Sequence, residues 1–238
     1  MSVDSAGAAP DEQSLAKAYP QVLRAAIGLG IYAGVFGATF GAVSVGSGLT
    51  VGETMILSLV MFSGASQFAF VGVAAAGSPW AAIPAALLLG VRNAFYGVPV
   101  SEILSPQGWR RLVTAHFVID ETTAMAVGQA EPRAKRYAFW STGLILFTLW
   151  QTGSLVGALL GTAIDPARFG LDAAAPAVFL ALLWPQLRTR SAEVVAVLGG
   201  LLAFLLIPIA PAGVPVIAAA AVAVAAGLTV RPRRVGAP

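Results

Sequence analysis

Residues 87–100 read LLLGVRNAFYGVPV, and this stretch indicates how the chain folds. It is apolar enough to belong to a membrane helix, yet it carries the permanent charge of Arg92 near its middle. An unpaired charge near the bilayer midplane costs about 2.5–3.5 kcal/mol on insertion scales, so such residues usually face a partner or a wet cavity. The stretch therefore predicts a membrane helix that presents an arginine to a polar site.

The rest of the chain has the composition of an integral membrane protein. Apolar types make up 58% of its 238 residues and charged types only 11%, whereas a soluble domain usually carries about 25% charged residues. The expected fold class is an all-α polytopic membrane protein. The basic residues are scattered among apolar runs, which argues against a nucleic-acid partner. The absence of cysteine excludes thiol catalysis and disulfides.

About seven to eight transmembrane helices are expected, some of them short or broken. The sixth and seventh candidates contain prolines, so either could be a half-helix. Together the candidates form one transmembrane transporter domain over 23–230, between a partly disordered cytoplasmic tail (1–22) and a basic cytoplasmic tail (231–238). Roughly twenty apolar residues cross the hydrocarbon, and the segments that meet this rule are 24–44, 53–76, 80–100, 111–128, 137–162, 173–187, 191–209 and 212–229.

The basic residues predict that both termini lie in the cytoplasm, because Lys and Arg are enriched on the cytoplasmic side of membrane proteins. With eight spans, three cations fall on the outer side, namely Arg110, Arg111 and Arg168. Ten fall on the inner side: Lys17, Arg24, Arg133, Lys135, Arg136, Arg188, Arg190, Arg231, Arg233 and Arg234.

Glycine stripes mark the first and fifth segments, and such stripes let helix backbones approach closely in lipid. Packing within the chain is the favoured interpretation, and a homodimer seam is the alternative. The same segments suggest an internal repeat, although chance agreement is left open. Each series runs from a glycine to an acid and, fourteen residues later, to a glutamine: Gly41, Glu53 and Gln67, then Gly161, Asp172 and Gln186.

Arg92 has a predicted partner in the next segment. It lies fourteen residues before Pro106, and Asp120 lies fourteen residues after it. Equal distance from a turn means equal depth in an antiparallel hairpin, so the two charges should meet. Only one of Asp120 and Glu121 can face Arg92 squarely, since neighbouring helical positions point about 100° apart. The alternative is that Arg92 reaches outward to the membrane surface.

Other polar residues surround this pair in the predicted membrane region. Asn93 and Tyr96 follow Arg92 and are candidates for substrate contacts. His116 lies four residues before Asp120, which would place both on one helix face and allow a proton relay. The alternative is a histidine at the membrane interface.

The stretch 62–70, FSGASQFAF, interrupts an apolar helix with Ser63, Ser66 and Gln67. The serines and the glycine between them should bend or break the helix, and broken helices often line the solute sites of transporters. Hydrogen bonding between packed helices is the alternative role for the three polar side chains.

Motifs for common enzyme chemistry are missing. The sequence contains no GxxxxGK[ST], HExxH or GxSxG, so no cofactor, no metal site and no enzymatic activity are expected. A membrane enzyme that uses Ser63, Ser66, His116 and Asp120 is an alternative class. A third class is a passive channel or a non-transporting membrane subunit.

Several segments of the chain resemble the AzlC family, the large subunits of two-component branched-chain amino acid exporters. The family pattern Asn-x-Arg-His is replaced here by Gly90, Val91, Arg92 and Asn93, so the arginine alone is kept. The segments that carry the resemblance are GVFGATFGAVSVGSGLTVGETMILSLVMFSGASQFAFVG (34–72), LLLGVRNAFYG (87–97), VIDETTAM (118–125) and LDAAAPAVFLALL (171–183).

The resemblance implies ion-driven export of branched-chain and similar apolar amino acids across a bacterial plasma membrane. It also implies a small AzlD-like membrane protein as partner. Combined with the residues, it suggests that Arg92 holds the substrate carboxylate and that Asp120 or Glu121 meets the ammonium or carries a proton. Ser63, Ser66 and Gln67 would add polar contacts.

Overall fold

The computed structural model describes residues 12–77, 79–163, 189–210 and 214–229, together with residues 180, 184 and 187. Within these residues the structure is helical and contains no strand, as expected. The predicted segment 173–187 and the tails 1–11 and 230–238 lie outside the described residues, apart from the three single positions. The predicted amino-terminal tail is helical from Glu12 onward, because α1 begins there.

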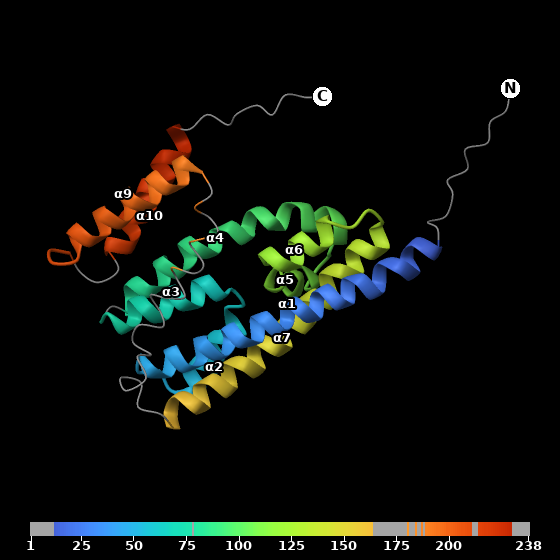
Figure 1. Cartoon of the computed structure of the whole chain (residues 1–238), viewed down its shortest axis with the longest axis horizontal. Coiled ribbons are helices and arrows are strands. Elements are labelled where there is room, and N and C mark those ends of the chain that lie inside the picture. Colours follow the sequence, from blue (N-terminus) through green and yellow to red (C-terminus); the bar gives the residue numbers. More distant parts are fainter. Residues whose placement is uncertain are drawn as a thin grey trace.

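Three long helices form the frame of the molecule: α1 (Glu12–Gly46), α4 (Pro79–Leu104) and α7 (Pro132–Ala163). Among the described residues, these are the helices long and apolar enough to cross a membrane. α1 and α7 run side by side in the same direction, and α4 runs the opposite way (Figure 1). The frame therefore has one end at which α1 and α7 begin and α4 ends, and a second end at which the reverse holds.

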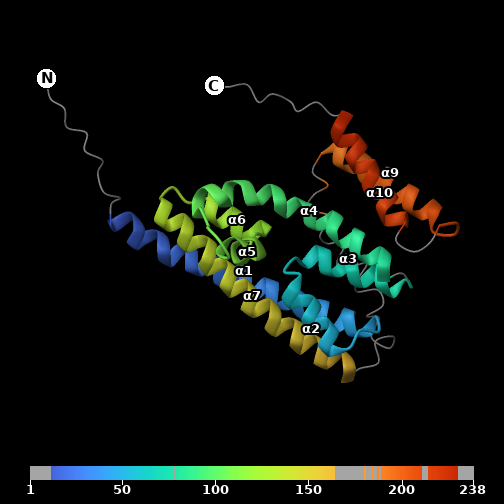
Figure 2. The same ribbon diagram turned by 180° about the vertical axis from the view of Figure 1, so that it is seen from behind.

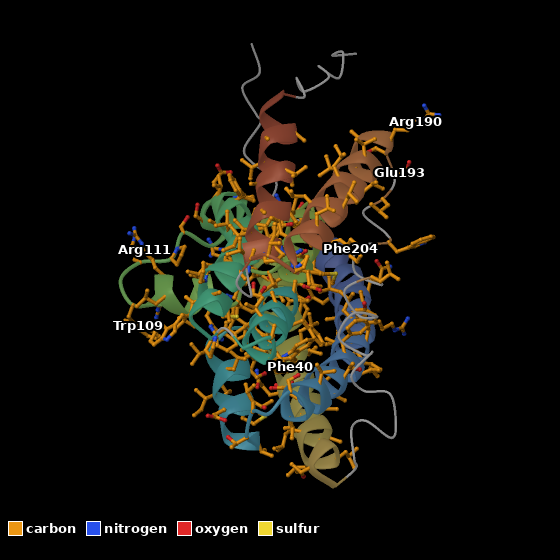
Figure 3. All side chains as sticks on the ribbon, turned by 90° about the vertical axis from the view of Figure 1, so that its left-hand side faces the viewer. Phe40, Trp109, Arg111, Arg190, Glu193 and Phe204 are labelled. Atoms are coloured by element: carbon orange, nitrogen blue, oxygen red, sulfur yellow. The ribbon has the colours of Figure 1, made fainter. Side chains whose placement is uncertain are left out.

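The glycine stripes of α1 and α7 face each other, so they pack within the chain as favoured from the sequence. A Cβ atom on Gly41 would lie 2.0 Å from the Ser154 carbonyl oxygen, and one on Gly157 would lie 1.8 Å from the Ala38 carbonyl oxygen. No larger side chain fits at such distances. The two backbones therefore touch, and Phe40 packs in the interior beside this seam (Figure 3).

The predicted span 53–76 is instead two short helices, α2 (Val51–Val60) and α3 (Gly64–Ala75), separated by a break at 61–63. α2 starts where α1 ends and reaches the middle of α7, where the Trp150 indole N–H donates to the Ser58 hydroxyl at 3.1 Å. α3 then returns beside the start of α4, through a small cluster of Val73, Ala82 and Ala85. Both limbs of this first hairpin lie at the same end of the frame (Figure 1).

The predicted span 111–128 is also two short helices, α5 (Arg110–His116) and α6 (Asp120–Val127). This second hairpin enters and leaves at the opposite end, between the end of α4 and the start of α7. The break at 117–119 is stabilised by Thr122, whose hydroxyl donates to the Phe117 carbonyl at 2.7 Å and accepts from the Ile119 N–H at 3.1 Å. The two re-entrant hairpins thus approach each other from opposite ends.

The tips of the two hairpins meet near the middle of α7. Phe62, from the first break, stacks on His116 with ring centroids 5.9 Å apart and meets the edge of Phe117 at 5.9 Å. Phe147 of α7 closes this cluster, 5.1 Å from Phe62.

This topology corrects the predicted position of two cations. Arg110 and Arg111 lie at the end where α1 and α7 begin, because the second hairpin does not cross the frame. Arg111 donates to the Pro106 carbonyl at 3.0 Å, and Arg136, near the start of α7, donates to the Ile103 carbonyl at 3.2 Å. We call this the cationic end. Figure 3 shows Arg111 projecting from the surface of the molecule.

The remaining described helices are α9 (Arg190–Leu206) and α10 (Val214–Thr229), which match the predicted segments 191–209 and 212–229. They pair closely where Gly199 faces Ala219 and lie beside α4 (Figures 1 and 2). The second half of the suggested repeat, with Asp172 and Gln186, lies outside the described residues, so the repeat stays a prediction.

Candidate functional site

An ion pair joins α4 to the tip of the second hairpin. The Arg92 Nη1 atom lies 3.2 Å from the Asp120 Oδ2 atom, and the two side chains are 44% and 42% exposed. Asp120 is the first residue of α6, where the helix dipole favours a negative charge. The guanidinium therefore has the acidic partner that the spacing around Pro106 predicts, and it does not extend unpaired into lipid.

A cavity of about 570 Å³ opens beside this pair, between the tips of the two hairpins and the three long helices. Pockets for small molecules usually measure about 300–1,000 Å³, so the size suits a small solute. The lining residues are Tyr32, Ala33, Phe36, Phe62, Ser63, Gly64, Ala65, Phe68, Leu89, Arg92, Tyr96, Ile119, Asp120, Glu121, Leu146 and Trp150.

The lining combines three charged groups with a mostly apolar wall. Arg92, Asp120 and Glu121 lie on α4 and at the start of α6, and most of the remaining lining comes from aromatic and aliphatic side chains. Within the described chain, Glu121 forms no ion pair, since Arg92 is engaged by Asp120. A site of this kind can bind a small molecule that carries both charges and an apolar side chain.

Two helix amino ends point at the cavity. The first backbone bond of α3 runs from the Gln67 N–H to the Ser63 carbonyl, so the amides of Gly64 and Ala65 have no acceptor within the helix. α6 begins at the other side of the cavity with Asp120 and Glu121. Broken helices whose positive ends face the solute are characteristic of membrane transporters.

Gln67 and Ser66 do not line the cavity, contrary to their predicted role. The buried Gln67 amide donates to the carbonyls of Ser58 and Met61, which the break deprives of helical partners. Ser66 is buried, and its hydroxyl accepts from the Ser63 hydroxyl at 3.3 Å. Both residues therefore hold the broken helix together, which is the alternative left open from the sequence.

His116 and Asn93 are also absent from the cavity lining. His116 ends α5 and stacks on Phe62, and the break at 117–119 separates it from Asp120. The relay predicted from one continuous helix face is therefore not formed. Ser63, Arg92, Tyr96, Asp120 and Glu121 are the predicted site residues that do line the cavity.

Trp150 is the main residue of the candidate site that was not predicted from the sequence. It lines the cavity, lies against Gly64, and donates to Ser58. The neighbouring Gln151 amide donates to the Ser58 carbonyl at 3.1 Å. The signal was a Trp-Gln pair directly before the glycine stripe of α7, in a segment assigned only to packing.

The described residues contain no group of three His, Asp or Glu side chains that could hold a metal ion.

A family model for the AzlC protein matches residues 28–164, more than half of the chain. The chain belongs to the AzlC family. The match begins in α1 and ends where α7 ends, so it includes both hairpins and every lining residue of the cavity. AzlC-family members are membrane proteins generally linked to transport.

Relatives of this AzlC-family chain are membrane proteins of bacteria and archaea. An uncharacterized membrane protein of Helicobacter pylori is 28% identical over 155 residues, 64% of this chain and 68% of that protein. The inner membrane protein YgaZ of Escherichia coli is 29% identical over 162 residues, 63% and 66% of the two chains. An uncharacterized membrane protein of Archaeoglobus fulgidus is 31% identical over 170 residues, 69% and 74%. No solved structure matches the chain.

Proposed function

We propose that the protein exports branched-chain and similar apolar amino acids across the plasma membrane, driven by an ion gradient. The observation that carries this proposal is the Arg92–Asp120 ion pair beside Glu121 in a cavity with largely apolar walls. A zwitterionic amino acid needs an anion site, a cation site and an apolar surface, and this cavity contains groups for all three.

Arg92 would bind the substrate carboxylate, because a guanidinium fork can bond both carboxylate oxygens and keeps its charge at every physiological pH. The carboxylate would displace Asp120, which could then bind the ammonium together with Glu121. Phe36, Phe62 and Leu146 would contact the branched side chain.

Charge balance suggests how an ion gradient could drive the exchange. Two acids and one arginine leave the cavity with one excess negative charge when all three are ionised. A zwitterion does not change that sum, whereas one proton neutralises it. Asp120 or Glu121 would therefore carry the coupling proton, since carboxylates held in membrane cavities are common proton carriers.

The proposed orientation places the cationic end, and with it the amino terminus, in the cytoplasm. The support for this orientation is the group of five basic residues at the cationic end, because positive charge favours the cytoplasmic side; they are Arg110, Arg111, Arg133, Lys135 and Arg136. The carboxyl-terminal tail is proposed to lie on the same side. A small AzlD-like membrane protein is proposed as the partner subunit.

A loading experiment tests the function. Cells that express the protein would be fed a leucine-containing dipeptide, and extracellular leucine would be followed with and without the small partner and an uncoupler. Leucine efflux that requires the protein and stops with the uncoupler supports ion-driven export. Efflux that is insensitive to the uncoupler would indicate a passive channel, and no efflux with the partner present would contradict transport of leucine.

The intramembrane enzyme is the weakest alternative. A serine nucleophile needs a base within hydrogen-bonding reach. Ser63 donates its hydroxyl to Ser66, and His116 stacks on Phe62. The described geometry therefore offers no activated serine in the cavity.

A further inference from the structure

A second cavity, of about 490 Å³, lies between the last turns of α4 and the helix α5. Its mouth is at the cationic end, where Ser105, Gln107 and Arg111 are exposed. Its deep part is lined by the buried residues Val100 and Thr114 and by Val118 of the second break. This hollow therefore leads from the cationic surface toward the middle of the frame, and nothing in the proposed binding site uses it.

Only a thin partition separates the second cavity from the first. Val118 lines the second cavity and the next residue, Ile119, lines the first. Ile119 has an extended backbone, with φ −133° and ψ 174°, in which successive side chains point to opposite sides. On α4 the same change occurs between Tyr96, which lines the first cavity, and Gly97, which lines the second.

The Arg92–Asp120 ion pair lies directly beside this partition. Asp120 follows Ile119 in sequence, and Arg92 lies one helical turn before Tyr96. The pair therefore ties the tip of the second hairpin to α4 next to the positions at which neighbouring residues line different cavities. α5, which forms the other wall of the second cavity, packs only marginally against the other described helices.

We infer that the second cavity is the continuation of the solute route toward the cationic end, and that residues 117–119 are its gate. A substrate carboxylate that takes Arg92 from Asp120 releases the hairpin tip from α4. Ile119 then moves away from Tyr96, and the two cavities join. The identity of the solute rests on the proposed function, whereas the route and the gate are measurable without any solute.

Cysteine labelling tests the route, because the natural chain contains no cysteine. Thr114→Cys would be treated with a water-soluble, membrane-impermeant methanethiosulfonate added to one side of oriented vesicles. Reaction should be about tenfold faster from the cationic end than from the other end, since thiol modification follows access. The matched control is Ala138→Cys, a buried position near the cationic end of α7 that lines neither cavity and should stay unreactive. Equal rates from both sides, or reaction only with a lipid-soluble maleimide, would overturn the route.

The gate is tested by labelling the first cavity through the second. Ser63→Cys should react slowly with the same reagent from the cationic end, because Ile119 blocks the way. Adding Asp120→Asn removes one charge of the ion pair with Arg92 that is proposed to keep the gate closed. This change should raise the rate of labelling by about tenfold. The matched control for Asp120→Asn is Glu102→Gln, which changes an exposed acid of α4 outside both cavities. It should leave the labelling rate of Ser63→Cys unchanged. An unchanged labelling rate in Asp120→Asn would show that the ion pair does not keep the gate closed.

Gly97 offers a blocking series that spares the fold. A Cβ atom at Gly97 would meet nothing within 4 Å, and Gly97 lines the second cavity. Export should fall stepwise from Gly97→Ala to Gly97→Leu, because flux depends on the width of the route. The expected loss in Gly97→Leu is about tenfold. Gly72→Leu, at a helical glycine with equally open space but away from both cavities, is the control. Full export in Gly97→Leu would overturn the route even if the proposed solute is correct.

Discussion

Both re-entrant hairpins consist of two short helices separated by a three-residue break, but they are held in different ways. The first is pinned by side chains: Trp150 and Gln151 of α7 and Gln67 of α3 all donate to Ser58. The second has internal bonds from Thr122, and its described polar link from the tip to α4 is the Arg92–Asp120 ion pair. We infer that the first hairpin is a fixed wall of the cavity and the second is the part that can move. The predictions below break or sharpen this difference, from the largest expected effect to the smallest.

Trp150, which holds the first hairpin, should contribute more to stability than Trp109 of the second hairpin. Trp150 is 8% exposed, and its replacement by alanine should cost about 3–5 kcal/mol of stability, as for other large buried aromatics. Trp109, at the mouth of the second hairpin, is 71% exposed, so Trp109→Ala should change stability by less than about 0.5 kcal/mol. Thermal unfolding in detergent measures both. Equal losses would remove the contrast between the hairpins.

The ion pair should control transport more than stability. Arg92→Ala and Asp120→Ala should each lower leucine export by about 10- to 100-fold, because charge-assisted hydrogen bonds contribute about 1.5–3 kcal/mol and 1.4 kcal/mol is tenfold. The double variant should be less destabilised than the sum of the two single variants, since each single change leaves one charge without its partner. Strictly additive losses would mean that the two groups do not interact in the membrane.

Gln67 should contribute to the stability of the first hairpin and not to the affinity for the solute. Gln67→Leu leaves the carbonyls of Ser58 and Met61 with fewer donors, so stability should fall by about 1–3 kcal/mol. The affinity for leucine should be unchanged in the folded fraction, because Gln67 is not part of the cavity lining. Gln21→Leu, at an exposed position of α1 that lines neither cavity, controls for the loss of an amide. A specific loss of leucine affinity in Gln67→Leu would return Gln67 to the binding site.

The smallest effect is expected where the first hairpin begins. Thr50 caps α2 by accepting from the Glu53 N–H, and the Glu53 carboxylate accepts from the Thr50 N–H and hydroxyl, each at 2.8 Å. These bonds lower the pKa of Glu53 below its ordinary value of 4.5. Thr50→Ala should cost about 1 kcal/mol of stability, as other amino-terminal caps do.

The lowered pKa of Glu53 also sets the direction of a pH effect. At a pH above the ordinary pKa of Glu53, its carboxylate stabilises the fold. This contribution is lost as the pH falls through the lowered pKa of the folded state. Unfolding measured over that acid range should therefore show a weaker pH dependence in Thr50→Ala than in the parent chain. An identical pH dependence would show that the cap does not form in solution.

The sequence predicted the pairing of Arg92 with Asp120 through equal distances from Pro106, and it predicted the weakness around Ser63 and Gly64. It did not predict the break at 117–119. That stretch is Phe-Val-Ile, with no glycine or proline, and the break depends on the Thr122 hydroxyl and on the contact with Phe62. The role given to Gln67 could not be assigned either, because a buried amide can equally contact a solute or a carbonyl.

By itself, the sequence determined that this is a helical membrane protein with an arginine and a facing acid inside the membrane, and that α1 can pack closely on a glycine-striped helix. Composition and spacing are enough for these features, because burial of charge and backbone contact have few solutions in lipid. Only the tertiary structure decided that two of the predicted spans turn back. Two half-helices of 10 and 12 residues add up to the length and hydropathy of one full span. Hydropathy counts apolar residues but carries no information about the direction of the chain. Whether each segment crosses or turns back therefore depends on side-chain contacts at the hairpin tips.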